Sequence, residues 1–220
     1  MSHATEILII RHGQTAWNKQ KRYQGHSDIP LNEKGELQAL ALAESLKQER
    51  LDAIISSDLQ RARKTAEEIA KWHGLPVKLD RDLRERCYGI FEGMQLEEIE
   101  RDYPEDLARW QAADPDQVFP PGERESESLR QFYHRAQSAL QRWAQTHPGQ
   151  KIAVVAHFGI IESAYRAAHR IPLGERIRMP VLNTSINRFT VKAGEIALLA
   201  WGEAEHLEPL RKPVEYLKHF

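Results

Sequence analysis

The chain has almost no cysteine: Cys87 is the single one among 220 residues. One thiol excludes an internal disulfide and a zinc site built from several cysteines. A cysteine-based phosphatase would need a phosphate-binding loop that ends in arginine, and the sequence after Cys87 (Tyr-Gly-Ile-Phe-Glu-Gly) is not such a loop. We therefore interpret Cys87 as a small, partly buried side chain.

Long apolar runs and an excess of one charge are also missing. The longest apolar run, 196–201, has six residues, whereas a membrane-spanning helix needs about 20. The net charge is −1, and acidic and basic residues are mixed, so no basic field attracts nucleic acid or an anionic membrane. The first residues do not form a secretory signal. We expect a cytoplasmic protein without nucleic-acid or membrane partners.

Sequence motifs for nucleotide and metal binding are missing as well. The chain has no G-x-x-x-x-G-K-[ST] loop, no G-x-G-x-x-G turn after a strand and no H-E-x-x-H pair. Several other histidines show no metal-ligand spacing: His26, His73, His134, His147, His169, His206 and His219. We expect neither a metal nor a cofactor.

Two histidines stand where short apolar runs end. His12 follows the run 7–10 through Arg11, and His157 follows the run 152–156. Such runs are typical of buried parallel strands, and ligands of open α/β sheets bind beyond the carboxyl ends of the strands. Two imidazoles and an arginine in one crevice indicate an anionic substrate and nucleophilic chemistry.

Strand-like and helix-like segments alternate along the chain. Strands are expected at 6–11, 53–57, 76–80, 152–156, 186–191 and 196–201. Helices are expected from Asn32 to Lys47, from Ser57 to Gly74, from Glu125 to Gln145, and from Gly159 to before Pro172. Ser57 and Gln60 fit a capping box. This order predicts an α/β fold: a three-layer α/β/α sandwich with a mostly parallel sheet and an antiparallel hairpin at Ala193-Gly194.

One polar segment, 92–123, departs from that alternation. It contains Pro104, Pro115, Pro120 and Pro121 and one expected short helix near 95–112. We interpret 92–123 as a lid-like excursion over the crevice of a single domain, 1–220. The apolar edge strand near 196–201 would let two copies pair, so a homodimer is one candidate assembly.

Four segments resemble, in order, the motifs of the histidine phosphatase superfamily, which includes the cofactor-dependent phosphoglycerate mutases. They are Arg11-His12-Gly13-Gln14-Thr15-Ala16-Trp17-Asn18, Ser56-Ser57-Asp58-Leu59-Gln60-Arg61-Ala62, Leu83-Arg84-Glu85-Arg86-Cys87-Tyr88-Gly89 with Glu92-Gly93, and Ala156-His157-Phe158-Gly159. The resemblance covers nearly the whole chain. It implies a phosphoglycerate mutase-like fold with an inserted lid.

The resemblance also implies a role for each matching residue. His12 would take the phosphoryl group as a phosphohistidine. Glu85 would protonate the leaving oxygen and then deprotonate the attacking water. Arg11, Arg61 and His157 would hold the phosphate oxygens. The matching positions on the substrate side are Asn18, Gln24, Gly25 and Tyr88.

Elementary electrostatics agrees with these roles. His12 must be neutral to attack, and neighbouring cations disfavour its protonation. His157 works best as imidazolium, which a bound dianion would favour, and Glu85 must start protonated. We therefore expect a mildly acidic to neutral pH optimum. Arginines and helix dipoles supply the positive charge, so the reaction is expected to be metal-independent.

Phe158 departs from the family pattern, in which glycine usually follows the second histidine. Its ring could stack on a substrate or pack on the core or the lid. The departure bears on the substrate rather than on the reaction.

Hydrolysis is favoured over phosphoglycerate mutase activity, which remains the alternative. A mutase must grip a second acidic group, but 94–116 holds only the basic residues Arg101 and Arg109. It also holds eight acidic residues, Glu97, Glu98, Glu100, Asp102, Glu105, Asp106, Asp114 and Asp116. A catalytically silent module that binds phospho-ligands is a second alternative. It would be expected to lack one of the four motif residues His12, Arg61, Glu85 or His157.

The natural substrate stays open among small phosphorylated metabolites: phosphoglycerates, phosphoserine, sugar phosphates and nucleotide-biosynthesis intermediates. The lid and the 203–220 tail are expected to form the outer wall of the pocket. Arg124, Arg176 and Arg178 could reach a second substrate charge, but exposed salt bridges are the favoured interpretation.

Overall fold

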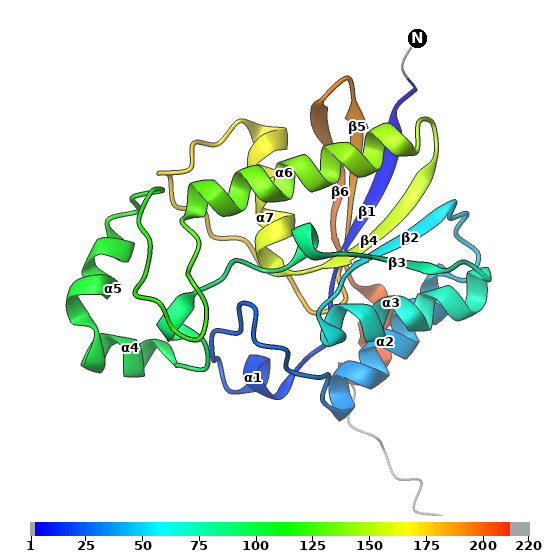
Figure 1. The fold of residues 1–220 in the computed structure, drawn as a ribbon. Coiled ribbons are helices and arrows are strands. Elements are labelled where there is room, and N and C mark those ends of the chain that lie inside the picture. The colour runs from blue at the N-terminus through cyan, green and yellow to red at the C-terminus, as the bar shows by residue number, and fades with distance from the viewer. Residues whose placement is uncertain (1–2, 212–220) are drawn as a thin grey trace, which may run out of the picture.

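One six-stranded sheet organises the protein. The computed structural model describes residues 3–211, and its strands have the order β3-β2-β4-β1-β5-β6 (Figure 1). The strands are β1 (Thr5–Arg11), β2 (Ala53–Ser57), β3 (Val77–Asp80), β4 (Lys151–Ala156), β5 (Ile186–Lys192) and β6 (Glu195–Glu203). Strands β1 to β4 are parallel, and β5 and β6 are antiparallel. The predicted α/β class and mostly parallel sheet are confirmed.

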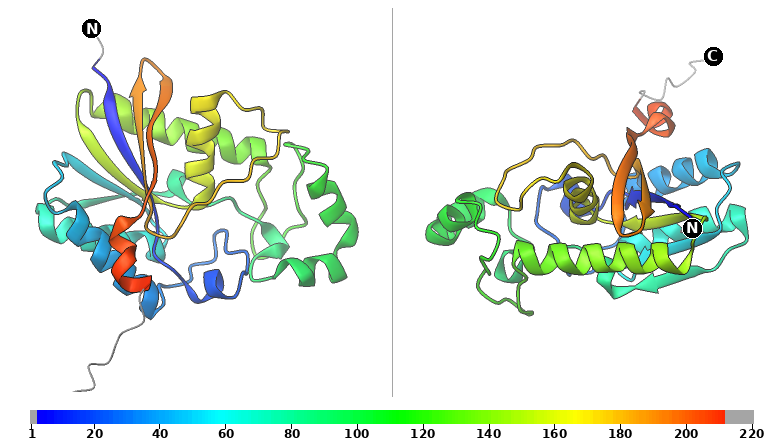
Figure 2. Two further views of the ribbon diagram at one scale, coloured as in Figure 1. Left: turned by 180° about the vertical axis from the view of Figure 1, so that it is seen from behind. Right: turned by 90° about the horizontal axis from the view of Figure 1, so that it is seen from above.

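Helices cover both faces of the sheet. The α-helices are α1 (Ala16–Lys19), α2 (Glu33–Leu46), α3 (Gln60–His73), α4 (Leu96–Asp102), α5 (Pro104–Gln111), α6 (Leu129–Thr146), α7 (Phe158–His169) and α8 (Glu208–Arg211). Short 3₁₀ helices are η1 (Arg81–Leu83), η2 (Gly89–Phe91) and η3 (Glu205–Leu207). Helices α6 and α7 lie on one face, and α2 and α3 lie on the other (Figure 2).

The central strand β1 shows why the sheet carries helices on both sides. Its side chains alternate between the faces. Ile7 and Ile9 join the cluster with α6 and α7, whereas Leu8 and Ile10 join the cluster with α2 and α3. All four are at most 1% exposed. A strand buried on both faces reads as a continuous apolar run, which is how the sequence predicted it.

The β5–β6 hairpin follows the turn chemistry of Ala193-Gly194. Both residues have positive φ, 50° and 85°. This is the backbone of the two-residue turn that matches the twist of a hairpin, and glycine adopts it without steric cost. The predicted antiparallel edge is confirmed.

Two predicted helix boundaries are wrong. Helix α3 begins at Gln60 without a side-chain cap from Ser57, because Asp28 Oδ1 accepts the Gln60 N–H at 2.7 Å from a distant loop. Helix α6 begins at Leu129 rather than near Glu125, because Ser128 caps it in a capping box with Gln131.

The single helix predicted near 95–112 is in fact two. Helix α4 ends at Asp102, and Pro104 starts α5, because a proline cannot continue the hydrogen bonds of a preceding helix. The excursion has its own apolar cluster, which includes Phe91, Leu107 and Phe119. Helices α4 and α5 stand beyond the carboxyl ends of the strands (Figure 1).

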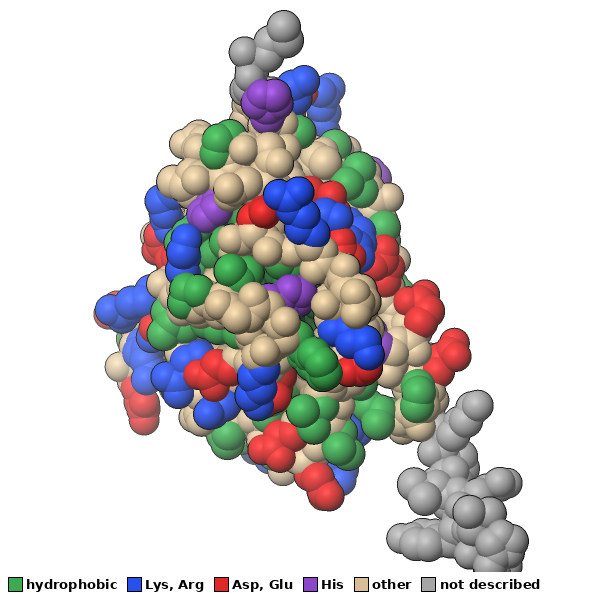
Figure 3. Space-filling model, turned by 90° about the vertical axis from the view of Figure 1, so that its right-hand side faces the viewer, with side chains coloured by type: hydrophobic (Ala, Val, Ile, Leu, Met, Phe, Trp, Pro, Cys, Tyr) green, Lys and Arg blue, Asp and Glu red, His purple; other side chains and the backbone are tan. Residues whose placement is uncertain are grey.

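The surface carries charges of both signs. On the face in Figure 3, basic and acidic side chains are interspersed without a large region of one sign. Within residues 3–211, no helix combines the length and apolarity that a membrane span requires.

Candidate active site

The two strand-end histidines lie side by side because their strands are neighbours. Arg11 pairs with Ala156 in the parallel β1–β4 ladder, so His12 and His157 leave the sheet at the same level. Their ring centroids are 5.1 Å apart, with an angle of 60° between the planes. Both side chains are buried. The two imidazoles that follow the apolar runs are therefore neighbours, as the sequence predicted.

His12 is held in one tautomer by its own loop. Its Nδ1 lies 2.7 Å from the carbonyl oxygen of Gly13. A carbonyl oxygen can only accept, so Nδ1 carries the proton and Nε2 keeps its lone pair. Burial lowers the pKa of His12 well below its usual value, and the charges of Arg61 and Arg11 lower it further. The lowered pKa favours the neutral ring, whose Nε2 lone pair has the form that a nucleophile in phosphoryl transfer needs.

His157 is held by a serine from the end of β2. Its Nε2 lies 2.9 Å from Ser57 Oγ, and its Nδ1 is buried without a hydrogen-bond partner among the described residues. Burial, followed by the charge of Arg61, lowers the pKa of His157 well below its usual value. The expected imidazolium is therefore not the state of His157 in this structure. That form would require a bound dianion, as expected from the sequence.

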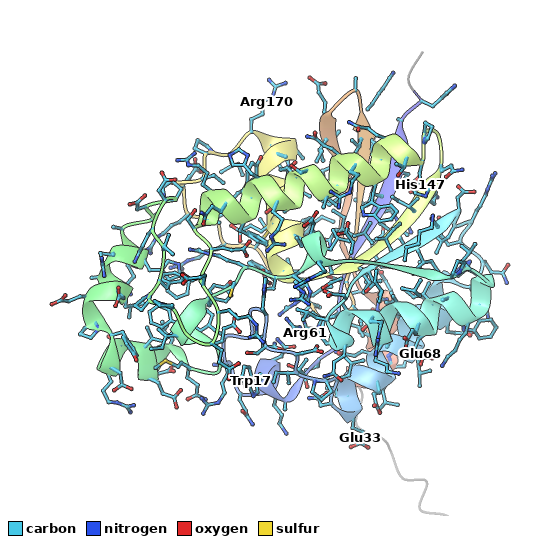
Figure 4. The ribbon with its side chains drawn as sticks, viewed as in Figure 1. Trp17, Glu33, Arg61, Glu68, His147 and Arg170 are labelled. Carbon is cyan, nitrogen blue, oxygen red and sulfur yellow. The ribbon has the colours of Figure 1, made fainter. Side chains whose placement is uncertain are left out.

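Two arginines complete the positive surroundings. Arg61 is fully buried at the start of α3, near the centre of the molecule (Figure 4). It donates to the carbonyl oxygens of Ser27 and Gly25 at 2.7 and 2.8 Å. Arg11 donates to the carbonyl oxygen of Val181 at 2.6 Å. The Nε atoms of both arginines are buried without a partner among the described residues. Burial lowers the pKa of Arg61 to about 10, so it remains a cation at neutral pH.

Glu85 lies near the charges of Arg61 and Arg11 and is held by backbone donors. Its Oε1 accepts the N–H of Arg86 at 2.9 Å, and its Oε2 accepts the N–H of Gly159 at 3.1 Å. Burial raises the pKa of Glu85, and these hydrogen bonds and the nearby arginines only partly offset that effect. A raised pKa favours the protonated form of the carboxyl, which is the form that a general acid needs.

Gly159 is required at its position because Glu85 packs directly on it. A Cβ atom there would lie 2.3 Å from Glu85 Oε1 and 2.7 Å from Phe132 Cζ. The position that cannot carry a side chain is therefore 159, and the departure from the family pattern, Phe158, is the residue before it. Its ring both packs on the core and lines a cavity.

The predicted substrate-side residues divide into two groups. Tyr88 and Phe158 line the cavity. Gln24 and Gly25 instead stabilise the loop to which they belong. Gln24 Oε1 accepts a hydrogen bond from Thr15 Oγ1 at 2.9 Å, and the Gly25 carbonyl oxygen accepts one from Arg61. Gly25 has φ 49°, and a Cβ there would meet the Glu92 carboxylate.

Asn18 is bonded from two sides. Its Oδ1 accepts the backbone N–H of Thr15 at 3.1 Å. Asn183 Nδ2 lies 3.4 Å from the same oxygen and donates to the His12 carbonyl at 2.9 Å. Asn183 ties the segment after α7 to both site residues. No motif in the sequence indicated this contact.

A cavity of ≈ 510 Å³ opens from Glu85 and Gly159 toward α5. Tyr23, Tyr88 and Trp110 form an aromatic wall, with ring centroids 5.2–6.0 Å apart. Such a wall can hold the leaving group of a phosphomonoester against apolar surface.

The same cavity carries more positive charge than the sequence predicted. Arg176 and Arg178 line it, and within residues 3–211 neither forms an ion pair with a carboxylate. Both side chains are exposed, as expected, but the predicted salt bridges are wrong for this pair. Arg124 does lie 3.8 Å from carboxylate oxygens of Glu92 and Glu123.

Arg86 was also missed as a cavity residue. It is 6% exposed, stacks on Phe119 with its guanidinium carbon 4.7 Å from the ring centroid, and lines the cavity. Its place directly after Glu85 in the third motif was the available signal.

The tail was expected to close the pocket, but its described part lies elsewhere. Residues 203–211 do not line the cavity. Helix η3 packs beside α2, and His206 Nε2 lies 3.2 Å from Thr184 Oγ1. Residues 212–220 lie outside the described residues.

The thiol of Cys87 is not one of the groups that make up the candidate active site. Cys87 is buried, and burial raises the pKa of its thiol to about 11. Its Sγ donates to Glu92 Oε1 at 3.3 Å. It is a thiol at neutral pH, as its interpretation as a packed side chain requires. In the part of the chain that the structure describes, no group of three or more His, Cys, Asp or Glu side chains is arranged to hold a metal.

The fold and the four motif segments define a known class. The profile of the histidine phosphatase superfamily (branch 1) matches residues 7–204, and the chain belongs to this superfamily. With relatives named as phosphoserine phosphatases, this chain is of the phosphoric monoester hydrolase type.

Relatives carry both phosphatase and mutase names. Phosphoglycerate mutase-like protein 4 of Arabidopsis thaliana is 40% identical over 92% of this chain and 87% of its own length. The metal-independent phosphoserine phosphatase of the same plant is 35% identical over 94% of this chain and 84% of its own length.

Solved structures share the fold over nearly their whole length. YhfR of Bacillus stearothermophilus is 30% identical, with a TM-score of 0.82 over 93% of this chain and all of its own. The phosphoserine phosphatase of Entamoeba histolytica, solved with 3-phosphoglyceric acid, is 26% identical. Its TM-score is 0.80 over 92% of this chain and 99% of its own.

Proposed function

We propose that the chain hydrolyses small phosphorylated metabolites through a phosphohistidine on His12, without a metal. One observation carries the proposal. Three buried nitrogen atoms beside His12, namely Arg11 Nε, Arg61 Nε and His157 Nδ1, have no hydrogen-bond partner within residues 3–211. An unsatisfied buried donor costs about 1–3 kcal/mol. A tetrahedral oxyanion bound at His12 offers the acceptor oxygens that such donors lack.

The first step uses the lone pair on His12 Nε2. That nitrogen forms a bond to phosphorus while the bond from phosphorus to the alcohol oxygen breaks. Glu85 gives its proton to the departing alcohol. Charge on the phosphoryl oxygens is stabilised by Arg11, Arg61 and His157.

The second step reverses the proton's direction. Water attacks phosphorus, the nitrogen–phosphorus bond breaks, and the Glu85 carboxylate takes the proton of the water. Because the acid form of Glu85 is needed first, kcat/KM should fall as the pH rises through its raised pKa.

Turnover of p-nitrophenyl phosphate in EDTA tests the proposal. We expect steady hydrolysis by the wild type and none by His12→Ala, because the alanine leaves no nucleophile. Absence of turnover in both proteins, or retained turnover in His12→Ala, would contradict the proposal. Retention of activity in EDTA also tests the metal-independent character.

The arginines of the cavity keep mutase activity as a second candidate. Arg86, Arg176 and Arg178 line the space next to Glu85 and could receive a second anionic group. Conversion of 3- to 2-phosphoglycerate that depends on 2,3-bisphosphoglycerate would identify a mutase. We expect phosphate release to exceed this conversion, because Arg101 and Arg109 of the lid are exposed and do not line the cavity.

The setting of the reaction is part of the same proposal. We place the protein in the cytoplasm as a single domain with 92–123 as a lid over the cavity. Two copies could pair through the edge strand β6, where Leu199 is 56% exposed. Light scattering of the purified protein measures that association directly.

A further inference from the structure

Glu85 lies in a segment that no regular structure supports. Residues 85–88 belong to neither a helix nor a strand, so no backbone ladder fixes their path. The carboxyl itself is held by two backbone N–H groups, those of Arg86 and Gly159. Its position therefore depends on how firmly the backbone around Glu85 is held.

Arg135 of α6 forms hydrogen bonds with that backbone. Its Nη1 donates to the carbonyl oxygens of Asp82 and Arg84 at 2.8 and 3.0 Å, and its Nη2 donates to the carbonyl of Glu85 at 3.1 Å. One guanidinium thus satisfies three carbonyls in the four residues that end at Glu85. An ammonium group cannot reproduce this planar arrangement of donors.

Glu127 fixes Arg135 and reaches the other side of Glu85. Its two oxygens accept from Arg135 Nε and Nη2, both at 2.7 Å, which is the bidentate geometry of strong charge-assisted pairs. Glu127 Oε2 also accepts the N–H of Cys87 at 3.0 Å. Burial raises the pKa of Glu127, but the hydrogen bond and charge of Arg135, the Cys87 N–H and the charge of His26 together bring it below its usual value, which favours the ionised form.

His26 adds a third contact. Its Nε2 lies 2.9 Å from the carbonyl oxygen of Glu85, which can only accept, so Nε2 donates. The same nitrogen is 3.8 Å from Glu127 Oε2. Side chains from the loop after α1, from the segment between the lid and α6, and from α6 therefore converge on the backbone of residues 82–87.

We propose that Glu127 and Arg135 are positioning residues for proton transfer by Glu85. This inference rests on the proposed function, in which Glu85 protonates the departing alcohol. Glu127 lies in the segment that returns from the lid to α6, so the pair also couples the lid to the proton donor. Neither residue lines the cavity, so their effect reaches the substrate only through Glu85.

The leaving group provides a test that a merely structural role would not satisfy. p-Nitrophenol is acidic enough to depart without a proton, whereas the alcohol of glycerol 2-phosphate needs one. The ratio kcat/KM reports the steps up to departure of the leaving group. Misplaced Glu85 should therefore slow glycerol 2-phosphate and spare p-nitrophenyl phosphate.

The experiment compares kcat/KM for both substrates in wild type, Glu85→Gln, Glu127→Gln and the double variant. Misplacement by about 1 Å costs about 100-fold. We expect Glu127→Gln to lose about 10- to 100-fold on glycerol 2-phosphate and less than about 3-fold on p-nitrophenyl phosphate. In the Glu85→Gln background it should cause no further loss, because residues that act as a unit are not additive.

Glu49→Gln is the matched control. The side chains of Glu49 and Glu127 are both 21% exposed, and both form ion pairs. The partners of Glu49 are Arg188 and Lys151, which do not belong to the candidate active site. It should leave both substrates unchanged. If Glu127→Gln does not fold, Arg135→Lys is measured in the same way and should show the same selective loss.

The outcomes separate the two proposals. An equal loss on both substrates in Glu127→Gln or Arg135→Lys, or a full additional loss in the double variant, would overturn the positioning role. If Glu85→Gln itself loses both substrates equally, the acid assignment of the proposed function fails instead.

Discussion

His12 and His157 meet edge to face, with ring centroids 5.1 Å apart, and each ring is anchored on a different element. His12 donates from Nδ1 to the carbonyl of Gly13, and His157 is bonded through Nε2 to Ser57. These anchors leave the lone pair of His12 Nε2 free, and within residues 3–211 His157 Nδ1 has no hydrogen-bond partner. The two histidines therefore differ in which ring nitrogen is already used, and this difference matches the separate roles that we propose for them.

Ser57→Ala should weaken catalysis through His157. The alanine leaves His157 Nε2 buried without its 2.9 Å partner, which frees the ring to turn and to change tautomer. We expect kcat/KM for p-nitrophenyl phosphate to fall about 10-fold, the size of a lost buried hydrogen bond of about 1.5 kcal/mol. Ser56→Ala is the matched control. Ser56 is equally buried but donates to the carbonyl of Ser57. Equal losses in the two variants would contradict the role of Ser57.

Gly159→Ala should lower activity by displacing the Glu85 carboxyl, and circular dichroism shows whether the variant still folds. The new Cβ would meet Glu85 Oε1 at 2.3 Å, so the carboxyl must move. A shift of that kind is expected to cost about 100-fold in kcat/KM for an alkyl phosphate. Gly174→Ala, whose Cβ would have no neighbour closer than 3.7 Å, should behave like the wild type. Steady-state kinetics and circular dichroism of both variants measure this, and full activity of Gly159→Ala would argue against the close packing of Glu85 on this glycine.

Stability should fall as the pH drops below the ordinary histidine pKa. The pKa values of His12 and His157 are lowered in the folded state, so the unfolded chain binds their protons first. The stabilising contribution is present above about pH 6.5 and is lost as the pH falls. Each histidine should remove up to about 1.4 kcal/mol of the unfolding free energy between pH 7.5 and 5.5.

Urea unfolding at those two pH values checks this prediction. His157→Gln should lose less stability on acidification than the wild type, by up to about 1.4 kcal/mol. Burial also lowers the pKa values of His26 and His206. Both residues are present in the wild type and in His157→Gln, so their effects on the pH dependence of stability cancel in the comparison. An identical pH dependence in the two proteins would show that His157 is not buried in its neutral form.

The sequence predicts the sheet well because each strand carries its own signal. β1 and β4 contain the unbroken apolar runs 7–10 and 152–156. Asn32 caps α2 locally, because its side chain accepts the Gly35 N–H three residues later. Local patterns of this kind are visible without knowledge of the fold.

Features that depend on distant residues could not be predicted. Ser57 looked like a helix cap, but its hydroxyl bonds to a histidine 100 positions away. The hydrogen bond from Arg135 to the Glu85 carbonyl oxygen joins residues 50 positions apart. Such contacts arise only once the sheet has brought the segments together.

The cavity shows the same limit. Arg176 and Arg178 were interpreted as exposed salt bridges, because nothing near them in the sequence indicated a wall of aromatic side chains. The structure places both arginines at the cavity.

Trapping of the phosphorylated enzyme tests the central claim most directly. The protein is mixed with p-nitrophenyl phosphate, quenched in alkaline denaturant, digested and examined by mass spectrometry. We predict one acid-labile phosphoryl group on the peptide that contains His12, and none in His12→Ala. A phosphoryl group on another residue, or rapid turnover with an enzyme that never becomes phosphorylated, would contradict the claim.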